Sequence, residues 1–201
     1  MRLSFFGLFL LWAVVSLAQV FIPVETSNRK SVAKIELTDI GIFGITRKAR
    51  PEFTKHLHTG IDIKRPKKDY LNPPFIFPIA PGKVISKRDE GPYSQLIIEH
   101  QIDDIVFWTI YEHVASIFVN LNEIVHPHKP MARFYSKEEL DAYGWQFDHF
   151  HFEILKVRPI KIESNPETLQ RRFGSYTMIC YDQETLEKYF YNPIKFLEKY
   201  L

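Results

Sequence analysis

The sequence has a single cysteine, Cys180, in 201 residues. An internal disulfide needs two cysteines, so none can form within the chain. A lipoprotein would carry a cysteine directly after its export signal, and none stands near residue 19. Cys180 also lies far along the chain from the histidine and aspartate motifs described below. The sequence therefore disfavours a mechanism that uses a cysteine nucleophile.

An excess of charge of one sign is also lacking, because Lys and Arg number 26, Asp and Glu number 24, and the formal net charge is +2. The one dense basic cluster, residues 64–68, has no aromatic residues interleaved for base stacking. We interpret it as a solvated loop and expect no nucleic-acid partner. With 201 residues and 45% hydrophobic content, the chain can bury the core of one domain but is short for two.

Long apolar runs are absent except at the start of the chain. Arg2 gives a positive start, residues 3–17 are almost uninterrupted apolar sequence, and Ser16-Leu17-Ala18 offers small residues for cleavage. We predict an export signal over 1–18, a mature protein that begins near Gln19, and a place in the periplasm or cell envelope. The alternative is a retained membrane anchor, which the short run disfavours.

Short apolar runs bounded by turn residues fill most of the mature chain, and long helical patterns between them are missing. Strands are predicted over 40–45, 60–63, 82–87, 95–100, 105–113, 117–119 and 149–155. Strands without intervening helices favour antiparallel sheets. A short inserted helix is predicted over 136–143, where Ser136 and Glu139 have capping-box spacing. Helices are also predicted over 183–190 and 193–201, the latter capped by Asn192.

The run Asp148-His149-Phe150-His151-Phe152-Glu153 alternates polar and aromatic residues with a period of two. In a strand, the two histidines and Glu153 share one face, and the phenylalanines share the other. The imidazoles would stand about 6.5 to 7 Å apart, so one could bind a metal while the other faces whatever the metal activates. The alternative is an amphipathic strand whose solvent face carries two histidines.

Two further motifs offer metal ligands or catalytic groups. His58 and Asp62 are four residues apart, about 13 Å in a continuous strand, too far to share an ion. A bend at Gly60 would let both side chains converge on one tetrahedral centre. His113 follows an apolar run and could stand at the mouth of such a site. The alternatives are surface turn residues and a partly buried histidine at a strand end.

Together these motifs resemble the signature of the lysostaphin-type (LytM-domain) zinc metallopeptidases. That signature is His-x-x-x-Asp, then Tyr-x-His followed by a hydrophobic residue, then His-x-His-Phe-Glu. The chain has all three in this order, at residues 58–62, 111–114 and 149–153. Flanking segments agree: Phe43-Gly44 with Arg47 and Arg50-Pro51, residues 78–84, residues 97–100, and Asn192-Pro193. The resemblance covers about 41–154 and this closing Asn-Pro.

The resemblance implies an all-β, mainly antiparallel LytM-type fold with a short inserted helix and C-terminal helices. It implies one domain over 19–201, with a core at about 41–154 and a C-terminal extension over 155–201. It further implies one zinc per chain, held by His58, Asp62 and His151, and catalytic roles for His113 and His149.

The implied activity is that of a monomeric, exported zinc metalloendopeptidase that cleaves peptide cross-links of peptidoglycan. A membrane is expected as a partner only if the N-terminal signal is uncleaved. The alternative is a catalytically silent LytM-type domain that binds and regulates another wall hydrolase. Glu153 either orients a histidine from behind or is a plain surface carboxylate.

The chain also departs from the family pattern. Residues 119–133 contain no glycine and carry His126-Pro127-His128, which is either a second metal site or an exposed loop. The inserted helix and residues 156–182 are unusual too. Four aromatic residues either line a substrate groove or fill the core: Tyr93, Tyr143, Trp145 and Phe147.

Overall fold

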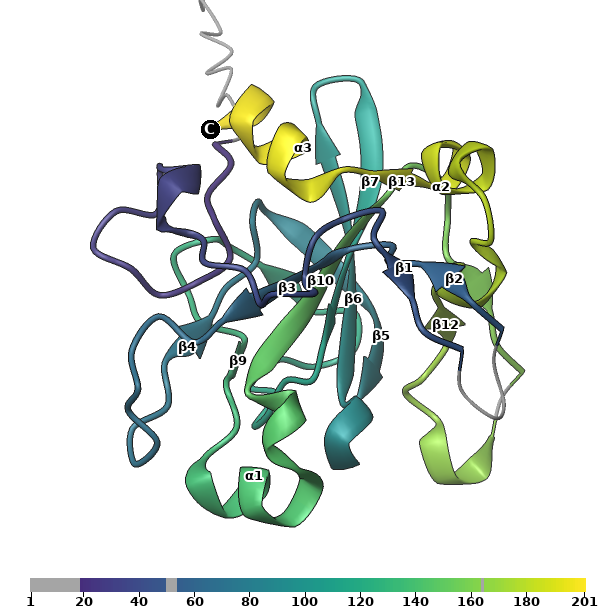
Figure 1. Ribbon diagram of the computed structural model, residues 1–201. Coiled ribbons are helices and arrows are strands. Elements are labelled where there is room, and N and C mark those ends of the chain that lie inside the picture. The colour runs from purple at the N-terminus through teal and green to yellow at the C-terminus, as the bar shows by residue number, and fades with distance from the viewer. Residues whose placement is uncertain (1–18, 50–53, 164) are drawn as a thin grey trace, which may run out of the picture.

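The computed structural model describes residues 19–49, 54–163 and 165–201. Its centre is an antiparallel sheet with the order β13-β10-β7-β6-β5-β8, in which β3 also pairs with β10. The strands of this sheet are β3 (Ile61–Lys64), β5 (Gly82–Arg88), β6 (Gln95–Ile102), β7 (Ile105–Glu112), β8 (Ile124–Val125), β10 (His149–Leu155) and β13 (Phe190–Tyr191). Every strand pairing in the described residues is antiparallel, which confirms the predicted fold class (Figure 1).

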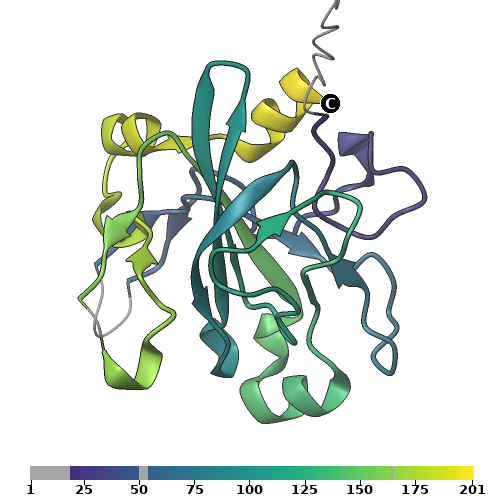
Figure 2. The same cartoon turned by 180° about the vertical axis from the view of Figure 1, so that it is seen from behind.

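Three pairs of very short strands surround this sheet. They are β1 (Thr46–Arg47) with β2 (His56–Leu57), β4 (Phe75–Ile76) with β9 (Ala132–Arg133), and β11 (Ile160–Lys161) with β12 (Phe173–Gly174). Short 3-10 helices connect several elements: η1 (Val32–Lys34), η2 (Gly91–Tyr93), η3 (Trp145–Phe147), η4 (Pro166–Thr168) and η5 (Thr177–Ile179). In both of the opposite views, the β6–β7 hairpin runs through the middle of the molecule (Figure 1, Figure 2).

The α-helices of the described residues begin where the sequence predicts. They are α1 (Lys137–Tyr143), α2 (Gln183–Tyr189) and α3 (Pro193–Tyr200). Ser136 and Glu139 form the full capping box at the start of α1. The Asn192 side chain accepts from two backbone N–H groups of α3, directly before Pro193. None of the helices in the described part of the chain has the length and apolar character that a membrane-spanning helix needs.

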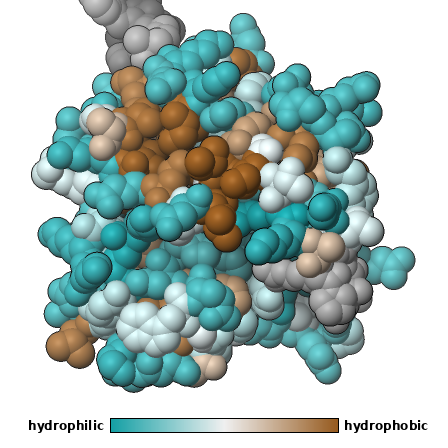
Figure 3. Space-filling model, in the orientation of Figure 1, coloured by the Kyte–Doolittle hydropathy of each residue, from teal (hydrophilic) through white to brown (hydrophobic). Residues whose placement is uncertain are grey.

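Two of the predicted strands are wrong. Residues 40–45 form a turn, in which Gly44 has a φ of +80° and donates its N–H to the His58 carbonyl. Ile40 and Ile42 of this loop are exposed, and apolar side chains gather where the loop crosses the upper part of the face in Figure 3. Residues 117–119 run beside residues 131–133 without forming a ladder. In both segments, the apolar residues match the strand pattern, but the backbone makes single hydrogen bonds to other segments instead of a continuous ladder.

The two faces of the sheet pack against different parts of the chain. One face carries the larger cluster, in which Phe150 and Phe152 are fully buried against Tyr111 and Phe134. Burying each phenylalanine contributes about 1.5 to 3 kcal/mol. Residues Val20, Ile22, Val24, Phe196 and Leu197 join this cluster from the two ends of the described chain.

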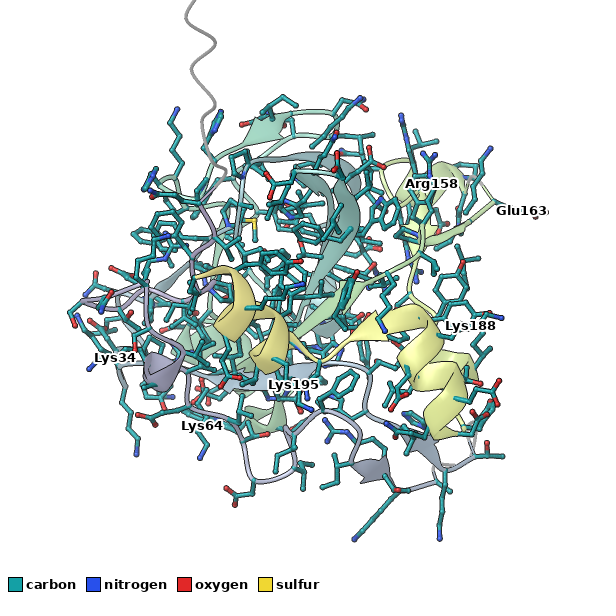
Figure 4. The ribbon with its side chains drawn as sticks, turned by 90° about the horizontal axis from the view of Figure 1, so that it is seen from above. Lys34, Lys64, Arg158, Glu163, Lys188 and Lys195 are labelled. Atoms are coloured by element: carbon teal, nitrogen blue, oxygen red, sulfur yellow. The ribbon has the colours of Figure 1, made fainter. Side chains whose placement is uncertain are left out.

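The opposite face carries a smaller apolar cluster. It joins Ile97, Trp108 and Leu155 of the sheet to Cys180 and to Leu186 of α2. His149, His151 and Glu153 alternate with the phenylalanines of β10 and so lie on this second face. Seen from above, Lys195 on α3 stands between Lys34 and Lys64 on one side and Arg158, Glu163 and Lys188 on the other (Figure 4). Arg158, Glu163 and Lys188 thus lie to one side of the molecule, whereas α3 crosses its middle in this view.

The predicted export signal over 1–18 lies outside the described residues, as do Arg50 and Pro51 of the family segment. The proposed division into a signal and one domain stays a prediction.

Candidate metal centre

The pairing of β3 with β10 brings the first and third motifs together. Asp62 lies directly opposite His151 in this antiparallel register. His58 precedes β3 and reaches the same point because the chain bends at Gly60. A Cβ at Gly60 would stand 2.3 Å from the Phe152 carbonyl oxygen and 2.9 Å from His151 Cε1. Glycine is therefore required for the close approach that places His58 beside β10.

Three ligand atoms converge in this position. His58 Nε2 lies 3.0 Å from His151 Nδ1 and 3.1 Å from Asp62 Oδ1. His151 Nδ1 lies 3.0 Å from Asp62 Oδ1, and all three residues are buried. Ligands at zinc distances in a tetrahedral site would be about 3.3 to 3.6 Å apart, so the triangle is close to that spacing. Two imidazole nitrogens and one carboxylate oxygen also match the donor types that zinc binds.

Each of the three side chains makes a hydrogen bond through the atom that faces away from the cluster. His58 Nδ1 donates to the Ile42 carbonyl oxygen at 3.0 Å, which leaves the lone pair on Nε2. Arg47 on β1 donates to Asp62 Oδ2 at 2.5 Å, which leaves Oδ1 for the cluster. His151 Nε2 lies 2.9 Å from Glu153 Oε1, which leaves Nδ1. Such partners orient ligands and fix histidine tautomers.

Glu153 is only 1% exposed, so the prediction that it orients a histidine fits the structure and the surface-carboxylate alternative is wrong.

The protonation of the three side chains follows from burial and from these contacts. Burial acts to raise the pKa of Asp62, but hydrogen bonds from His151 and His58 outweigh it and hold the pKa far below its usual range. Burial lowers the pKa of His58. Burial also opposes charge on His151, yet hydrogen bonds to Asp62 and Glu153 raise its pKa to about 10. The carboxylates thus stabilise positive charge at this point, whether that charge is a proton or a metal ion.

His113 and His149 stand next to this cluster. Their ring centroids are 5.4 Å apart, and His149 Nε2 lies 3.8 Å from Asp62 Oδ1. His113 follows β7 with a φ of +61°, a conformation rare for a residue with a side chain. Its Nδ1 donates to the Pro92 carbonyl oxygen at 2.6 Å, so its Nε2 carries the lone pair. Burial lowers the pKa of both His113 and His149 to about 4, which keeps both neutral at pH 7.

Aromatic side chains line the approach to His113. The Phe147 ring lies 4.9 Å from the His113 ring, and Tyr93 lies 5.8 Å from it. Tyr93, Tyr143 and Trp145 are 43%, 38% and 48% exposed. The core-filling alternative is therefore wrong for these three, whereas Phe147 is partly buried beside Tyr135 and Leu140. Tyr93 of η2 and Phe147 of η3 therefore flank His113, whereas Tyr143 contacts Tyr135 and Trp145 contacts Tyr70.

Every residue that the sequence predicts for the site is found in one place. His58, Asp62 and His151 form the triangle, and His113 and His149 flank it. Among the residues that the structure describes, this is the one group of at least three His, Cys, Asp or Glu residues close enough to hold a metal. His126 and His128 are exposed, and His128 packs edge-on against Phe21.

Sequence reasoning missed three residues around the site. Arg47 was noted only as part of a flanking segment, although it binds Asp62. Ser175 and Thr177 lie in the C-terminal extension, and both donate to Glu153. No local pattern identifies them, because their contact with β10 depends on the path of residues 156–182.

No family model matches the chain, and no curated protein matches it. Solved structures do resemble it. A zinc-containing peptidase from Vibrio cholerae is 22% identical with a TM-score of 0.46, and the match covers 68% of this chain and 37% of that one. The catalytic domain of the M23 protein EnpA from Enterococcus faecalis is 22% identical with a TM-score of 0.37, covering 66% and 94%.

A chain of the SpoIIQ–SpoIIIAH pore-forming complex is also similar, at 17% identity and a TM-score of 0.44, with coverage of 86% and 98%. All three matches are under 25% identical with TM-scores below 0.5, and the chain spans well under half of the Vibrio cholerae protein.

Proposed function

We propose that this chain is an exported zinc metalloendopeptidase that hydrolyses peptide cross-links of peptidoglycan. One observation carries the proposal: three ligand atoms, His58 Nε2, His151 Nδ1 and one oxygen of Asp62, converge within 3.1 Å beside two neutral histidines. Without a metal, the proton on His151 satisfies Asp62, and a metal cation that replaces this proton would meet three ligand atoms at once. A catalytic zinc typically has three protein ligands and leaves its fourth position open.

His58, Asp62 and His151 would hold the zinc. When bound, zinc acts as a Lewis acid on a carbonyl and lowers the pKa of a bound water toward about 7. Arg47 keeps Asp62 turned toward the site, and Glu153 does the same for His151. These partners restrict the rotamers of the ligands before any metal arrives.

His113 and His149 supply the proton chemistry in this proposal. Both are neutral at pH 7, so either can accept a proton from water during attack on a peptide carbonyl. The imidazole that becomes charged can donate a hydrogen bond to the oxyanion that forms at the carbonyl. The Pro92 carbonyl fixes the His113 ring so that Nε2, and not Nδ1, is the working atom.

The substrate class rests on the motif resemblance and on the aromatic surface beside His113. Exposed Tyr93 and its neighbour Phe147 offer flat apolar contacts for an extended peptide, and both lie on short 3-10 helices outside the main sheet. We propose short cross-linking peptides as substrates and expect slow or no cleavage of ordinary proteins such as casein. The protein would act as a monomer.

The test is a digest of purified cross-linked muropeptides with the zinc-reconstituted protein. We expect about one zinc per chain, release of un-cross-linked peptides, loss of cleavage after zinc is removed with a chelator, and no cleavage by His113→Ala. A protein that binds no zinc after reconstitution would contradict the mechanism. A zinc-loaded protein that leaves every muropeptide intact but activates a second wall hydrolase would favour the regulatory, catalytically silent alternative.

A further inference from the structure

Glu153 accepts more hydrogen bonds than its contact with His151 requires. Thr59 Oγ1 donates to Glu153 Oε1 at 2.5 Å, and Thr177 Oγ1 donates to the same oxygen at 2.7 Å. Ser175 Oγ donates to Glu153 Oε2 at 2.5 Å. Together with His151 Nε2, four donors surround one buried carboxylate, which offers about four acceptor sites. Three of these donors lie at Oε1 and one at Oε2, so both oxygens of Glu153 are fixed in place.

This arrangement fixes where the Glu153 carboxylate lies beside His151. His151 Nε2 stands 2.9 Å from Glu153 Oε1, so the position of this carboxylate sets the orientation of the imidazole ring. In that orientation Nδ1 faces Asp62 and His58. The hydroxyl groups so fix the orientation of His151 through Glu153, without contacting the histidine themselves.

Two of the three hydroxyl groups come from the segment 170–180, which the structure fastens at three places. Arg172 and Phe173 donate their backbone N–H groups to Ser86 Oγ on β5. The Tyr176 ring stacks on Tyr189 of α2 at 4.4 Å. The Cys180 carbonyl accepts from Leu57 N–H on β2 at 2.8 Å. Ser175 and Thr177 lie between these points, so the backbone fixes both hydroxyl groups against Glu153.

We propose that segment 170–180 is a positioning element for the metal centre, in which Ser175 and Thr177 act through Glu153 to fix His151 for zinc binding. The inference rests on the proposed function, because it assigns the same zinc ligands. It assigns the C-terminal extension a role in zinc binding, separate from its effect on the shape of the substrate groove. It also predicts that substitutions in this segment and in β10 change zinc affinity through the same contacts.

Matched variants of the full chain test this. Thr177→Val keeps the shape of the side chain and removes the donor, whereas Thr177→Ser keeps the hydroxyl. We expect Thr177→Val to weaken zinc affinity about tenfold in competition with a chelator, and Thr177→Ser to stay within about twofold of the parent protein. Ser175→Ala should resemble Thr177→Val. With Co²⁺ in place of zinc, the visible spectrum of Thr177→Val should shift, which a general loss of stability would not produce.

A double-mutant cycle then tests whether Thr177 acts through Glu153. Glu153→Gln alone should weaken zinc binding by about 10- to 100-fold, and adding Thr177→Val should cost less than it does in the parent protein. Full additivity, or equal zinc affinity and spectra in the valine and serine variants, would overturn the inference while leaving the proposed function intact. A parent protein that binds no zinc would instead overturn both.

Discussion

Two buried histidine sites lie in different parts of this molecule, and they differ in what their second nitrogens do. His100 on β6 is 1% exposed, and protein partners occupy both of its nitrogens. Its Nδ1 donates to the Pro81 carbonyl at 2.9 Å, and its Nε2 accepts from the Thr109 hydroxyl at 2.8 Å. At the metal centre, His58 and His151 each have one nitrogen fixed by the protein while the other faces the two remaining atoms of the ligand triangle.

The comparison separates a histidine that completes the core from one arranged to bind a cation. His100 needs nothing more, because its donor and its acceptor are both satisfied. The pair formed by His58 and His151 is satisfied only when something positive lies between them and Asp62. Burial alone does not distinguish the sites, since His58, His100 and His151 are all buried.

Removing one histidine from each site tests the difference between the two sites most strongly. His151→Ala should abolish zinc binding and activity, because it deletes a ligand. His100→Ala should keep one zinc per chain and lose about 2 to 4 kcal/mol of stability, because it leaves a cavity and unpaired polar groups. Metal analysis and urea unfolding measure both effects. Equal zinc loss in the two variants would mean that His100 also supports the metal.

The next prediction separates the ligands of the metal centre from the two histidines beside them. His149→Ala and His113→Ala should retain most of their zinc and lose about 10²- to 10⁴-fold in turnover, because neither belongs to the ligand triangle. Steady-state kinetics on muropeptides, with zinc content measured on the same samples, would check this. Zinc loss in His149→Ala as complete as in His151→Ala would show that the two roles are misassigned.

The strand and the ligands were predictable to different degrees. Period-two alternation located β10 from His149 to Leu155, and Gly60 correctly indicated the bend between His58 and Asp62. Both signals are local, so one sequence contains them. Some of the supporting contacts span more of the chain: Arg47 is 15 residues from Asp62, and Thr177 is 24 residues from Glu153. Such contacts depend on tertiary packing, which periodicity does not encode.

The false strands have a related cause. Residues 40–45 have the apolar content of a strand, but Gly44 turns the chain so that its N–H reaches the His58 carbonyl and the Ile42 carbonyl reaches His58 Nδ1. The loop thus serves the metal centre rather than a sheet. This local conflict between pattern and structure occurs at the site, where such conflicts are expected.

Lowering the pH should affect the stability that depends on His100. Burial lowers the pKa of His100 to about 4, while an unfolded histidine titrates near 6.5. The folded state therefore favours the neutral form, and its stability is complete above about pH 6.5 and falls as the pH drops toward 4. The loss amounts to about 3 kcal/mol.

The measurement for this is urea unfolding of metal-free protein at pH 7.5 and 4.5. The parent protein should lose more stability between these pH values than His100→Gln, by up to that amount. Other buried histidines contribute equally to both proteins, so the difference isolates His100. An identical pH dependence in the two proteins would contradict its assignment as a neutral core residue.

The smallest expected effect concerns Arg47. Arg47→Ala removes the donor that turns Asp62 toward the cluster and should weaken zinc affinity about tenfold. Lys48→Ala is the matched control, because Lys48 is exposed on the same segment and should leave zinc affinity unchanged. Competition with a chelator measures both variants. A similar change in the two would indicate an effect of overall charge instead of orientation.

The central claim is that one zinc binds to three named atoms. The most direct measurement is a crystal structure of the zinc-loaded protein with anomalous scattering recorded at the zinc edge. We predict one strong peak per chain, about 2.0 to 2.2 Å from His58 Nε2, Asp62 Oδ1 and His151 Nδ1. A zinc-loaded crystal with no peak between these atoms, or with its peak at His126 and His128, would contradict the account.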